Sequence, residues 1–309
     1  MLYFAPSNEY IFLPDAPRNV DPLVRVPGET DVKEQGGIYM VDIVVRKASL
    51  LEKFFPQLHD GASLVPASSV IPPGVTESEQ RQQSLDEMSQ SQKIAAAVAL
   101  RALGYKVAAR PVGVEVTGVL PDQPADGKLE IGDRIEGVNG HPVRTLEDLR
   151  GEMAKVDPGQ DLTFRVRRSG GGQDIRLGTR ENPANAARAF VGITIDQSVD
   201  IRLPLAVKID SGSIGGPSAG LAFALDIYDE LGHDIDDDKR IVVTGALMLD
   251  GKVGEIGGIK QKTIAAREAD ADLFLVPDAN EASARRYADG LEVVPVTTFR
   301  EALSVLTKE

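Results

Sequence analysis

The feature that most constrains the fold is a change of texture in the middle of the chain. Residues 112–180 contain short apolar runs separated by tight turns, with one helical stretch from about Leu146 to Lys155 and a closing turn through residues 169–172. The residues on both sides follow longer helix and strand patterns instead. This contrast predicts a small β-rich domain inserted into a larger α+β unit.

The stretch "LPDQPADGKLEIGDRIEGVNGHPV" carries the most specific turns of this middle segment. In it, Gly132-Asp133 turns the chain into a strand, and Asn139-Gly140 makes the next turn. The order of these pieces resembles a PDZ domain of the permuted bacterial type. The resemblance implies a peptide-binding loop near residues 110–114, with three candidate ligand residues: Val112, Gly113 and Val114.

The flanking segments predict the remaining architecture. Residues 38–45 alternate with two largely apolar faces, so we expect one mostly buried strand there. Helical spacing predicts a helix that Gly104 ends and another over residues 217–231. The overall prediction is an α+β fold with three segments: 1–110, an inserted domain over 111–182, and 183–309.

Charge and residue usage exclude several classes of function. The chain has 34 basic and 47 acidic residues, a net charge of -13, which does not suit a general phosphate-seeking surface for nucleic acid. The absence of cysteine excludes disulfides, zinc-cysteine sites and a thiol nucleophile. No window of about 18 apolar residues and no signal-peptide plan occurs, so this chain is expected to be soluble.

The segment "SGSIGGPSAG" places Ser218 directly before a predicted helix. Two interpretations are open. Ser218 is a small residue in an ordinary helix start, or it is a nucleophile whose oxyanion is held by free N–H groups of the first helical turn. Pro217 suits the first helical position, and Gly215 and Gly216 let a substrate backbone come close.

Lys260 opens the predicted helix "KQKTIAAREA", where the helix dipole disfavours a cation. Partial burial would lower the pKa of such a lysine, and a neutral amine can take a proton from a serine hydroxyl. The alternative is that Lys260 and Lys262 are solvated charges beside a glycine turn.

Other chemistry has weaker support in the sequence. His141 and His233 are expected in surface turns away from Ser218, and His59 has no surrounding signature of a catalytic base. The acidic run "DIDDDKR" does not follow the calcium-loop spacing, and a solvated turn is expected there. The segment "GALMLDGKV" fails the phosphate-loop pattern twice, and no Ser-x-x-Lys motif occurs.

Together, "GGPSAG", "VTGALMLDGKVGEIGGIKQKTIAA" and "LFLVPDAN" resemble the proteolytic domain of the Lon serine proteases over about residues 205–280. The resemblance implies a serine-lysine dyad with Ser218 as nucleophile and Lys260 as general base. Thr244 matches the threonine placed to orient the lysine amine, and backbone N–H groups near Gly216 to Ser218 would hold the oxyanion, with Pro217 as a supporting residue at the start of the helix. Gly215 and Ala246 depart from the residues common in the family at those positions.

The resemblance further implies an ATP-independent endopeptidase that acts on unfolded or tail-exposed polypeptides and needs no metal or cofactor. It implies a homo-oligomer, for which a ring is one arrangement. It also implies a location at the extracytoplasmic face of the bacterial membrane, where the family members are held by an N-terminal anchor that this sequence lacks. The alternative from another class is a non-catalytic module whose PDZ domain captures extended tails by strand addition.

Overall fold

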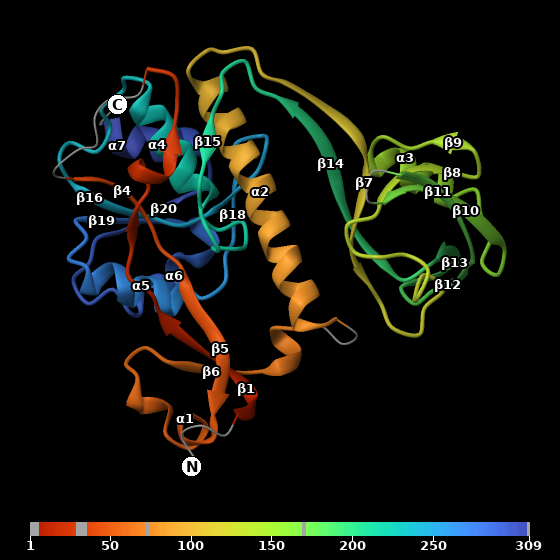
Figure 1. The fold of residues 1–309 in the computed structure, drawn as a ribbon, viewed down its shortest axis with the longest axis horizontal. Coiled ribbons are helices and arrows are strands. Elements are labelled where there is room, and N and C mark those ends of the chain that lie inside the picture. The colour runs from red at the N-terminus through yellow and green to blue at the C-terminus, as the bar shows by residue number, and fades with distance from the viewer. Residues whose placement is uncertain (1–5, 29–35, 72–74, 169–170, 308–309) are drawn as a thin grey trace. The chain divides into compact units, whose positions relative to one another are not determined.

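The computed structural model describes residues 6–28, 36–71, 75–168 and 171–307 (Figure 1). The chain divides into two compact units. Unit 1 combines Met1–Val107 with Leu203–Glu309, and unit 2 is Ala108–Arg202. Helices and strands are mixed in both halves of unit 1, and unit 2 is mainly strands, which confirms the α+β class.

The centre of unit 1 is a five-stranded sheet with the order β2-β4-β16-β19-β20. The strands from β4 to β20 run parallel, and β2 pairs antiparallel at one edge. Short, almost wholly apolar runs such as "LFLVP" form these strands, as expected for a parallel sheet buried on both faces. The strands are β2 (Arg18–Asn19), β4 (Gly37–Met40), β16 (Arg240–Val243), β19 (Leu273–Pro277) and β20 (Val293–Val296).

Helices cover both faces of this sheet. Ile241 and Val243 pack into a core cluster with one group of helices, whereas Val242 between them packs into a second cluster on the opposite face, because side chains alternate along a strand. The first group is α2 (Glu77–Ala102), α4 (Gly220–Glu230) and α7 (Phe299–Thr307). The second is α5 (Ile259–Glu268) and α6 (Glu281–Arg285).

Three smaller sheets complete unit 1. A three-stranded antiparallel sheet has the order β5-β1-β6, and two further strand pairs are β3 with β15 and β17 with β18. The strands are β1 (Pro6–Pro14), β3 (Val24–Arg25), β5 (Ile43–Ser49), β6 (Ser63–Pro66), β15 (Lys208–Ile209), β17 (Ala246–Leu247) and β18 (Val253–Gly254). The short helices are α1 (Leu50–Phe54), η1 (Asp21–Leu23), η2 (Pro56–Leu58), η3 (Ala67–Ser69) and η4 (Asp278–Asn280).

The prediction of a single, mostly buried strand over residues 38–45 is wrong. The segment forms β4 in the central sheet and β5 in the three-stranded sheet, with Val41 and Asp42 between them. Val44 and Val45 are exposed on β5. The alternation of apolar residues continues through the bend, so it does not reveal that the chain changes sheets.

Helix α2 is the longest helix of the described residues, with 26 residues. Thr76 begins it with a capping box, in which the Thr76 hydroxyl accepts from the Glu79 N–H and the Glu79 carboxylate accepts from the Thr76 N–H. Among the helices of the described segments, none combines the length and the apolar character that crossing a bilayer requires.

Unit 2 is built on a sheet with the order β11-β10-β8-β7-β14, and β9 pairs with β8. The unit reaches beyond residue 182, where the inserted domain was expected to end, because β14 pairs with β7 from Val119 to Ala108. Its elements are β7 (Ala108–Val119), β8 (Arg134–Val138), β9 (His141–Pro142), α3 (Leu146–Met153), β10 (Asp161–Arg168), β11 (Gly171–Gly178), β12 (Arg180–Asn182), β13 (Asn185–Phe190) and β14 (Ile193–Arg202).

Candidate active site

Ser218 lies in a turn directly before α4, which begins at Gly220 rather than at the expected residue 217. The residue that precedes the helix is Ala219, and no side chain caps the helix there. The Ser218 hydroxyl instead lies 2.7 Å from Nζ of Lys262. The helix-start interpretation therefore does not account for this hydroxyl, whereas a role in chemistry does.

Lys262 is a buried amine between two hydroxyl groups. Its side chain is only 2% exposed, and its Nζ donates to Ser218 Oγ and, at 3.0 Å, to Thr244 Oγ1. The residue stands in the first turn of α5, where its backbone N–H donates to the carbonyl of Gly258. The helix start thus carries the amine into the interior, against the nucleophile turn.

Thr244 holds both partners in place. It follows β16 directly, is fully buried, and its Oγ1 donates to the Ser218 carbonyl at 3.3 Å while it accepts from Lys262. The N–H of Gly245 donates to the same carbonyl at 2.8 Å. The contact of Thr244 with a lysine amine agrees with the sequence prediction, although the lysine is a different one.

Burial sets the protonation of Lys262. Removing the ammonium from water lowers the pKa of Lys262 from 10.5 to about 8, and the negative charge of Asp42 opposes this shift in part. An amine with a pKa of about 8 is neutral in about one molecule in ten at pH 7, and in about half of the molecules at pH 8. It can therefore accept a proton from the hydroxyl beside it.

The predicted pairing of Lys260 with Ser218 is wrong. The Lys260 amine donates to the carbonyl of Ala62 at 2.9 Å and to Ser63 Oγ at 3.3 Å, and lies 5.8 Å from the ring centre of Tyr287. Two residues along a helix rotate a side chain by about 200°, so Lys260 and Lys262 lie on opposite faces of α5. Lys260 ties the start of α5 to the start of β6.

The sequence contains a signal that favours Lys262 over Lys260. Residues three and four apart share a helix face. Lys262 shares its face with Ile259, Ala265 and Ala266, whereas Lys260 shares its face with Thr263, Ile264 and, one turn further, Arg267. A lysine surrounded by apolar neighbours at these spacings is the better candidate for a buried amine.

The turn that carries Ser218 is held to α2 by hydrogen bonds of backbone groups. The Gly216 N–H donates to the carbonyl of Ser84 at 2.7 Å, and the Ser91 hydroxyl donates to the carbonyl of Pro217 at 3.1 Å. A Cβ at Gly215 would lie 2.7 Å from Cβ of Ser84, so glycine is needed for this approach of the turn to α2. Gly215 therefore serves the packing of the protein itself.

These contacts correct the expected roles of Gly216 and Pro217. The Gly216 N–H already donates to Ser84, so it does not point to an oxyanion in this structure. Pro217 has no N–H, lies exposed in the bend, and precedes α4 instead of opening it. The Ser218 N–H, close to the positive end of α4, is the remaining candidate donor of the three positions.

The three histidines have other surroundings. His59 Nε2 lies 2.8 Å from Oε1 of Glu52, a buried carboxylate that Arg46 also binds. His141 lies on β9 in unit 2, and the His233 ring lies 4.5 Å from the ring of Tyr228. The Ser218 hydroxyl contacts Lys262 instead.

In unit 2, the candidate ligand residues lie on the wrong strand for strand addition. Val112, Gly113 and Val114 belong to β7, and Val114 pairs with Ile135 of β8 on one side and with Gln197 of β14 on the other. An inner strand has no free edge for a peptide, so this prediction is wrong. The strand at that end of the described sheet is β14.

Gln197 connects β14 to the start of α3. Its Nε2 donates to the carbonyls of Gly113 and Arg144, and its Oε1 accepts from the Leu146 N–H at the beginning of the helix. The side chain therefore fixes β14 beside α3 within unit 2. The described sheet ends in β14 on this side and in β11 on the other.

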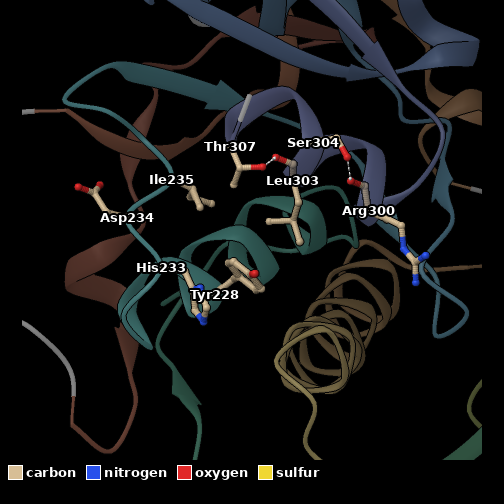
Figure 2. A pocket seen from close by; sticks show the side chains of 8 residues that line it. All are labelled: Tyr228, His233, Asp234, Ile235, Arg300, Leu303, Ser304 and Thr307. Atoms are coloured by element: carbon tan, nitrogen blue, oxygen red, sulfur yellow. Dashed lines mark hydrogen bonds between the residues drawn. The ribbon is translucent and has the colours of Figure 1, made fainter. Parts of the chain in front are cut away.

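A hollow of about 300 Å³ lies elsewhere in unit 1, between the end of α4 and α7 (Figure 2). Tyr228 and His233 line one side, and Arg300 lies on the α7 side. Ser218, Lys262 and Thr244 are not among its lining residues. The hollow is therefore separate from the candidate active site.

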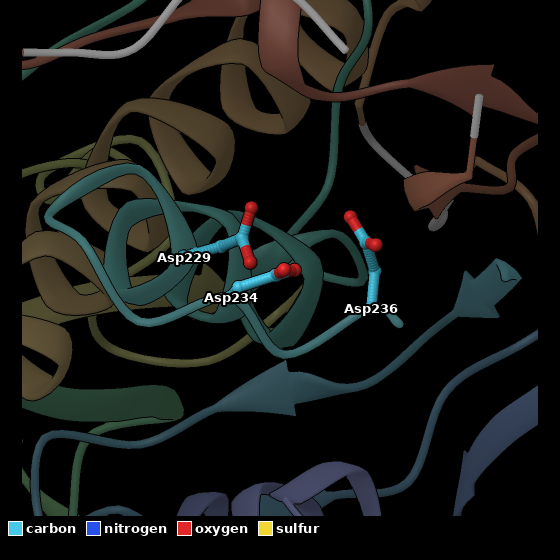
Figure 3. Close-up of side chains that lie close together, drawn as sticks. All are labelled: Asp229, Asp234 and Asp236. Atoms are coloured by element: carbon cyan, nitrogen blue, oxygen red, sulfur yellow. The ribbon is translucent and has the colours of Figure 1, made fainter. Parts of the chain in front are cut away.

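The acidic run after α4 gathers three carboxylates. Oxygens of Asp229, Asp234 and Asp236 lie within 4.8 Å of one another (Figure 3). Asp229 accepts from the Ile235 N–H and Asp236 from the Asp238 N–H, so these groups organise the turn. Asp236 is only 1% exposed, so the expectation of a wholly solvated turn is wrong at this residue.

Comparison with known families places two domains in the chain. Residues 187–308 match the Lon protease (S16) C-terminal proteolytic domain, and residues 87–179 match the PDZ domain. The chain therefore contains both kinds of domain, as the sequence predicts. The matched ranges differ from units 1 and 2: the PDZ match begins within α2 and ends before β14, and the Lon match begins within unit 2.

Individual relatives are similar over part of their length. Lon protease 2 of Bacillus subtilis (strain 168) is 33% identical over 131 residues, which cover 42% of this chain and 23% of the relative. Lon protease of Mycoplasma pneumoniae is 34% identical over 129 residues, which cover 41% of this chain and 15% of the relative. The chain thus spans less than a quarter of these relatives.

A solved PDZ domain, that of the SdrC-like protein Lmo2051 of Listeria monocytogenes, is 19% identical to this chain. It is covered to 87%, covers 27% of this chain, and has a TM-score of 0.25.

Proposed function

From a Lon-type proteolytic domain joined to a PDZ domain, we propose that this chain is a serine endopeptidase that cleaves unfolded or tail-bearing polypeptides without ATP. The observation that carries the proposal is the 2.7 Å distance between the Ser218 hydroxyl and the buried Lys262 amine. A serine becomes a nucleophile when a neutral base lies within hydrogen-bonding distance. The lowered pKa of Lys262 supplies such a base.

The proposed reaction has two halves. Ser218 Oγ attacks the scissile carbonyl carbon while Lys262 Nζ takes the hydroxyl proton, and Lys262 then gives that proton to the leaving amine. Water attacks the resulting ester, with Lys262 again taking and returning a proton. Thr244 keeps the amine aimed at Ser218 Oγ, and the Ser218 N–H at the start of α4 is the proposed oxyanion donor.

The proposed role of unit 2 is to recruit substrates by strand addition. The edge of β14 replaces residues 112–114 as the proposed peptide site, because β14 stands at the end of the described sheet and lies beside α3. Captured tails raise the local concentration of their substrates at the dyad. We propose that hydrolysis by this chain needs no ATP. The rate of casein hydrolysis measured with and without ATP tests this proposal.

A serine-directed fluorophosphonate probe tests the proposal together with hydrolysis of casein. Ser218→Ala should abolish both labelling and hydrolysis, because the alanine has no oxygen to attack the carbonyl or the phosphorus. Ser213→Ala is the matched control, since Ser213 is an exposed serine of the same loop. Equal labelling of wild type and Ser218→Ala would remove Ser218 as the nucleophile. An unlabelled and inactive wild type would favour the non-catalytic binding module.

Assembly and location remain predictions from the family resemblance. We propose a homo-oligomer, and a full-length protein held at the extracytoplasmic face of the bacterial membrane by an N-terminal anchor. Sedimentation velocity over a range of concentrations checks the first, and fractionation of cells that produce the full-length protein checks the second.

A further inference from the structure

Asp42 occupies the bend where the chain leaves the central sheet. It follows β4 by two residues and precedes β5 directly. β4 and β16 run parallel with Met40 opposite Val243, and Thr244 is the residue after Val243. The bend that contains Asp42 therefore lies next to the strand end that carries Thr244.

The residue after Asp42 contacts the start of α5. A Cβ at Gly258, the residue that precedes α5, would lie 2.8 Å from Cδ1 of Ile43, so this glycine and Ile43 are in close contact. Lys262 stands one turn into the same helix. Asp42 is thus held between the two elements that carry the amine and its orienting hydroxyl.

Asp42 acts on Lys262 through its charge. The hydrogen bonds of the Lys262 amine go to two neutral hydroxyls, Ser218 and Thr244, whereas the electrostatic influence of Asp42 stabilises the ammonium form. The effect is reciprocal: burial raises the pKa of Asp42, and Lys262 counteracts that rise. A carboxylate that lies near the Lys262 ammonium stabilises the protonated form of the amine. Because it does not accept a hydrogen bond from the ammonium, the bonds to Ser218 and Thr244 are kept.

The other charged groups nearby have weaker or opposed roles. Asp15 and Arg18, which bind each other at 2.8 Å, act on Asp42 with opposite signs. On α5 itself, the Lys260 ammonium is directed to the carbonyl of Ala62. The charge of Asp42 raises the pKa of Lys262 and so opposes the effect of burial.

We propose that Asp42 is a positioning residue for the dyad: its carboxylate is the counter-charge that stabilises the Lys262 ammonium after the amine has taken the proton of Ser218. The inference rests on the proposed serine-lysine mechanism. Asp42 forms no bond with the substrate in this role and moves no proton. It makes the charge-separated stage of the reaction more favourable inside a buried site.

Asp42→Asn separates charge from structure. The Asp42 side chain accepts the Ile43 N–H at 2.8 Å through Oδ1, and asparagine can keep this hydrogen bond while it removes the negative charge. Loss of the charge should lower the pKa of Lys262, so the rise of activity with pH should move to lower pH by about one unit, and the maximal rate should fall by roughly tenfold. Asp15→Asn is the matched control and should leave the profile in place.

Titration of Lys262 itself distinguishes this inference from the proposed function. In a Ser218→Ala background with 13C-labelled lysine, NMR should show the Lys262 resonance titrating at lower pH in Asp42→Asn than in its parent, whether or not the protein is a peptidase. An unchanged titration and pH profile would overturn the role of Asp42 and leave the dyad standing. If instead Lys262→Met hydrolyses casein normally, the dyad fails.

Asp42→Glu provides a second variant in case the asparagine protein is unstable, with cooperative melting checked for both. Because glutamate keeps the charge, the titration of Lys262 should stay within a few tenths of a unit of the parent value. A structural role alone would reduce activity in both variants without moving the pH profile, and that result would also overturn the inference.

Discussion

The two faces of α5 each carry a lysine, and the two lysines have opposite surroundings. Lys262 faces the interior, where its ammonium has left water and is held by hydroxyl groups. Lys260 is half-buried, and its amine donates to the carbonyl of Ala62, the residue before β6. Burial therefore distinguishes the two lysines: the buried one is the proposed base, and the half-buried one attaches α5 to the start of β6.

The largest expected difference between the faces is in activity. Lys262→Met should lower the rate of casein hydrolysis by roughly 10³-fold or more, because loss of a positioned general base removes about 10²–10⁴ in rate and the nucleophile also loses its neighbour. Lys260→Met should keep most of the activity. Hydrolysis by the two purified variants at pH 8 gives the comparison, and the reverse ranking would restore the pairing of Lys260 with Ser218.

The pH dependence should follow the buried lysine. Below the pKa of Lys262, about 8, the amine is protonated, so activity should fall by about tenfold for each unit of decreasing pH. Peptide hydrolysis between pH 6 and pH 10 measures this limb. Lys260→Met should leave the limb where it is, and a shift of the limb in that variant would show that Lys260 takes part.

Of the two lysines of α5, Lys262 is the one whose amine donates a hydrogen bond to Thr244. Thr244→Val keeps the shape of the side chain but removes the hydroxyl that orients Lys262, so the rate should fall by about tenfold while the acid limb persists. Thr244→Ser, which retains the hydroxyl, is the matched control and should recover most of the rate. Steady-state kinetics at pH 9 tests both, and full activity of Thr244→Val would show that the hydroxyl is dispensable.

The effects expected on stability differ in sign between the two lysines. Burial lowers the pKa of Lys262 from 10.5 to about 8, so the folded state disfavours the ammonium by about 3 kcal/mol below pH 8, and this cost disappears as pH rises from 8 to 10.5. Lys262→Met should therefore be more stable than wild type at pH 7.

Lys260→Met should be less stable by about 1 kcal/mol, because it loses the bond to Ala62. Melting temperatures at pH 7 and pH 10 measure both changes. A Lys262→Met protein that melts below wild type at pH 7 would contradict the desolvation argument.

Local patterns predicted what local geometry determines. The segments around Ser218 and around the turns of the middle domain are specific over a few consecutive residues, so the two kinds of domain are recognisable from the sequence, although α4 begins three residues later than predicted. The lysine was misplaced by two positions because both lysines follow the same glycine turn, and the choice between them depends on which helix face is buried. Helix periodicity carries that information, although the turn motif does not.

Non-local pairing explains the other errors. The resemblance to a permuted PDZ domain places the peptide site at residues 112–114, and nothing in that stretch reveals that β14, about 80 residues later, covers the edge of β7. The bend at Asp42 was missed for a similar reason, since the apolar alternation of residues 38–45 continues while the pairing partners change. Both features depend on strands that are distant in sequence.

The contact between α2 and the nucleophile turn has a consequence for the newly made chain. Ser91 and Pro217, which bind each other, are 126 residues apart, and unit 2 lies between them. A ribosome releases α2 first, then the whole of unit 2, and Lys262 only near the end. Domains fold largely as units during synthesis, so unit 2 can fold before the turn that carries Ser218 is available to pack against α2. We therefore expect the contact of Ser218 with Lys262 to form only after α5 has left the ribosome.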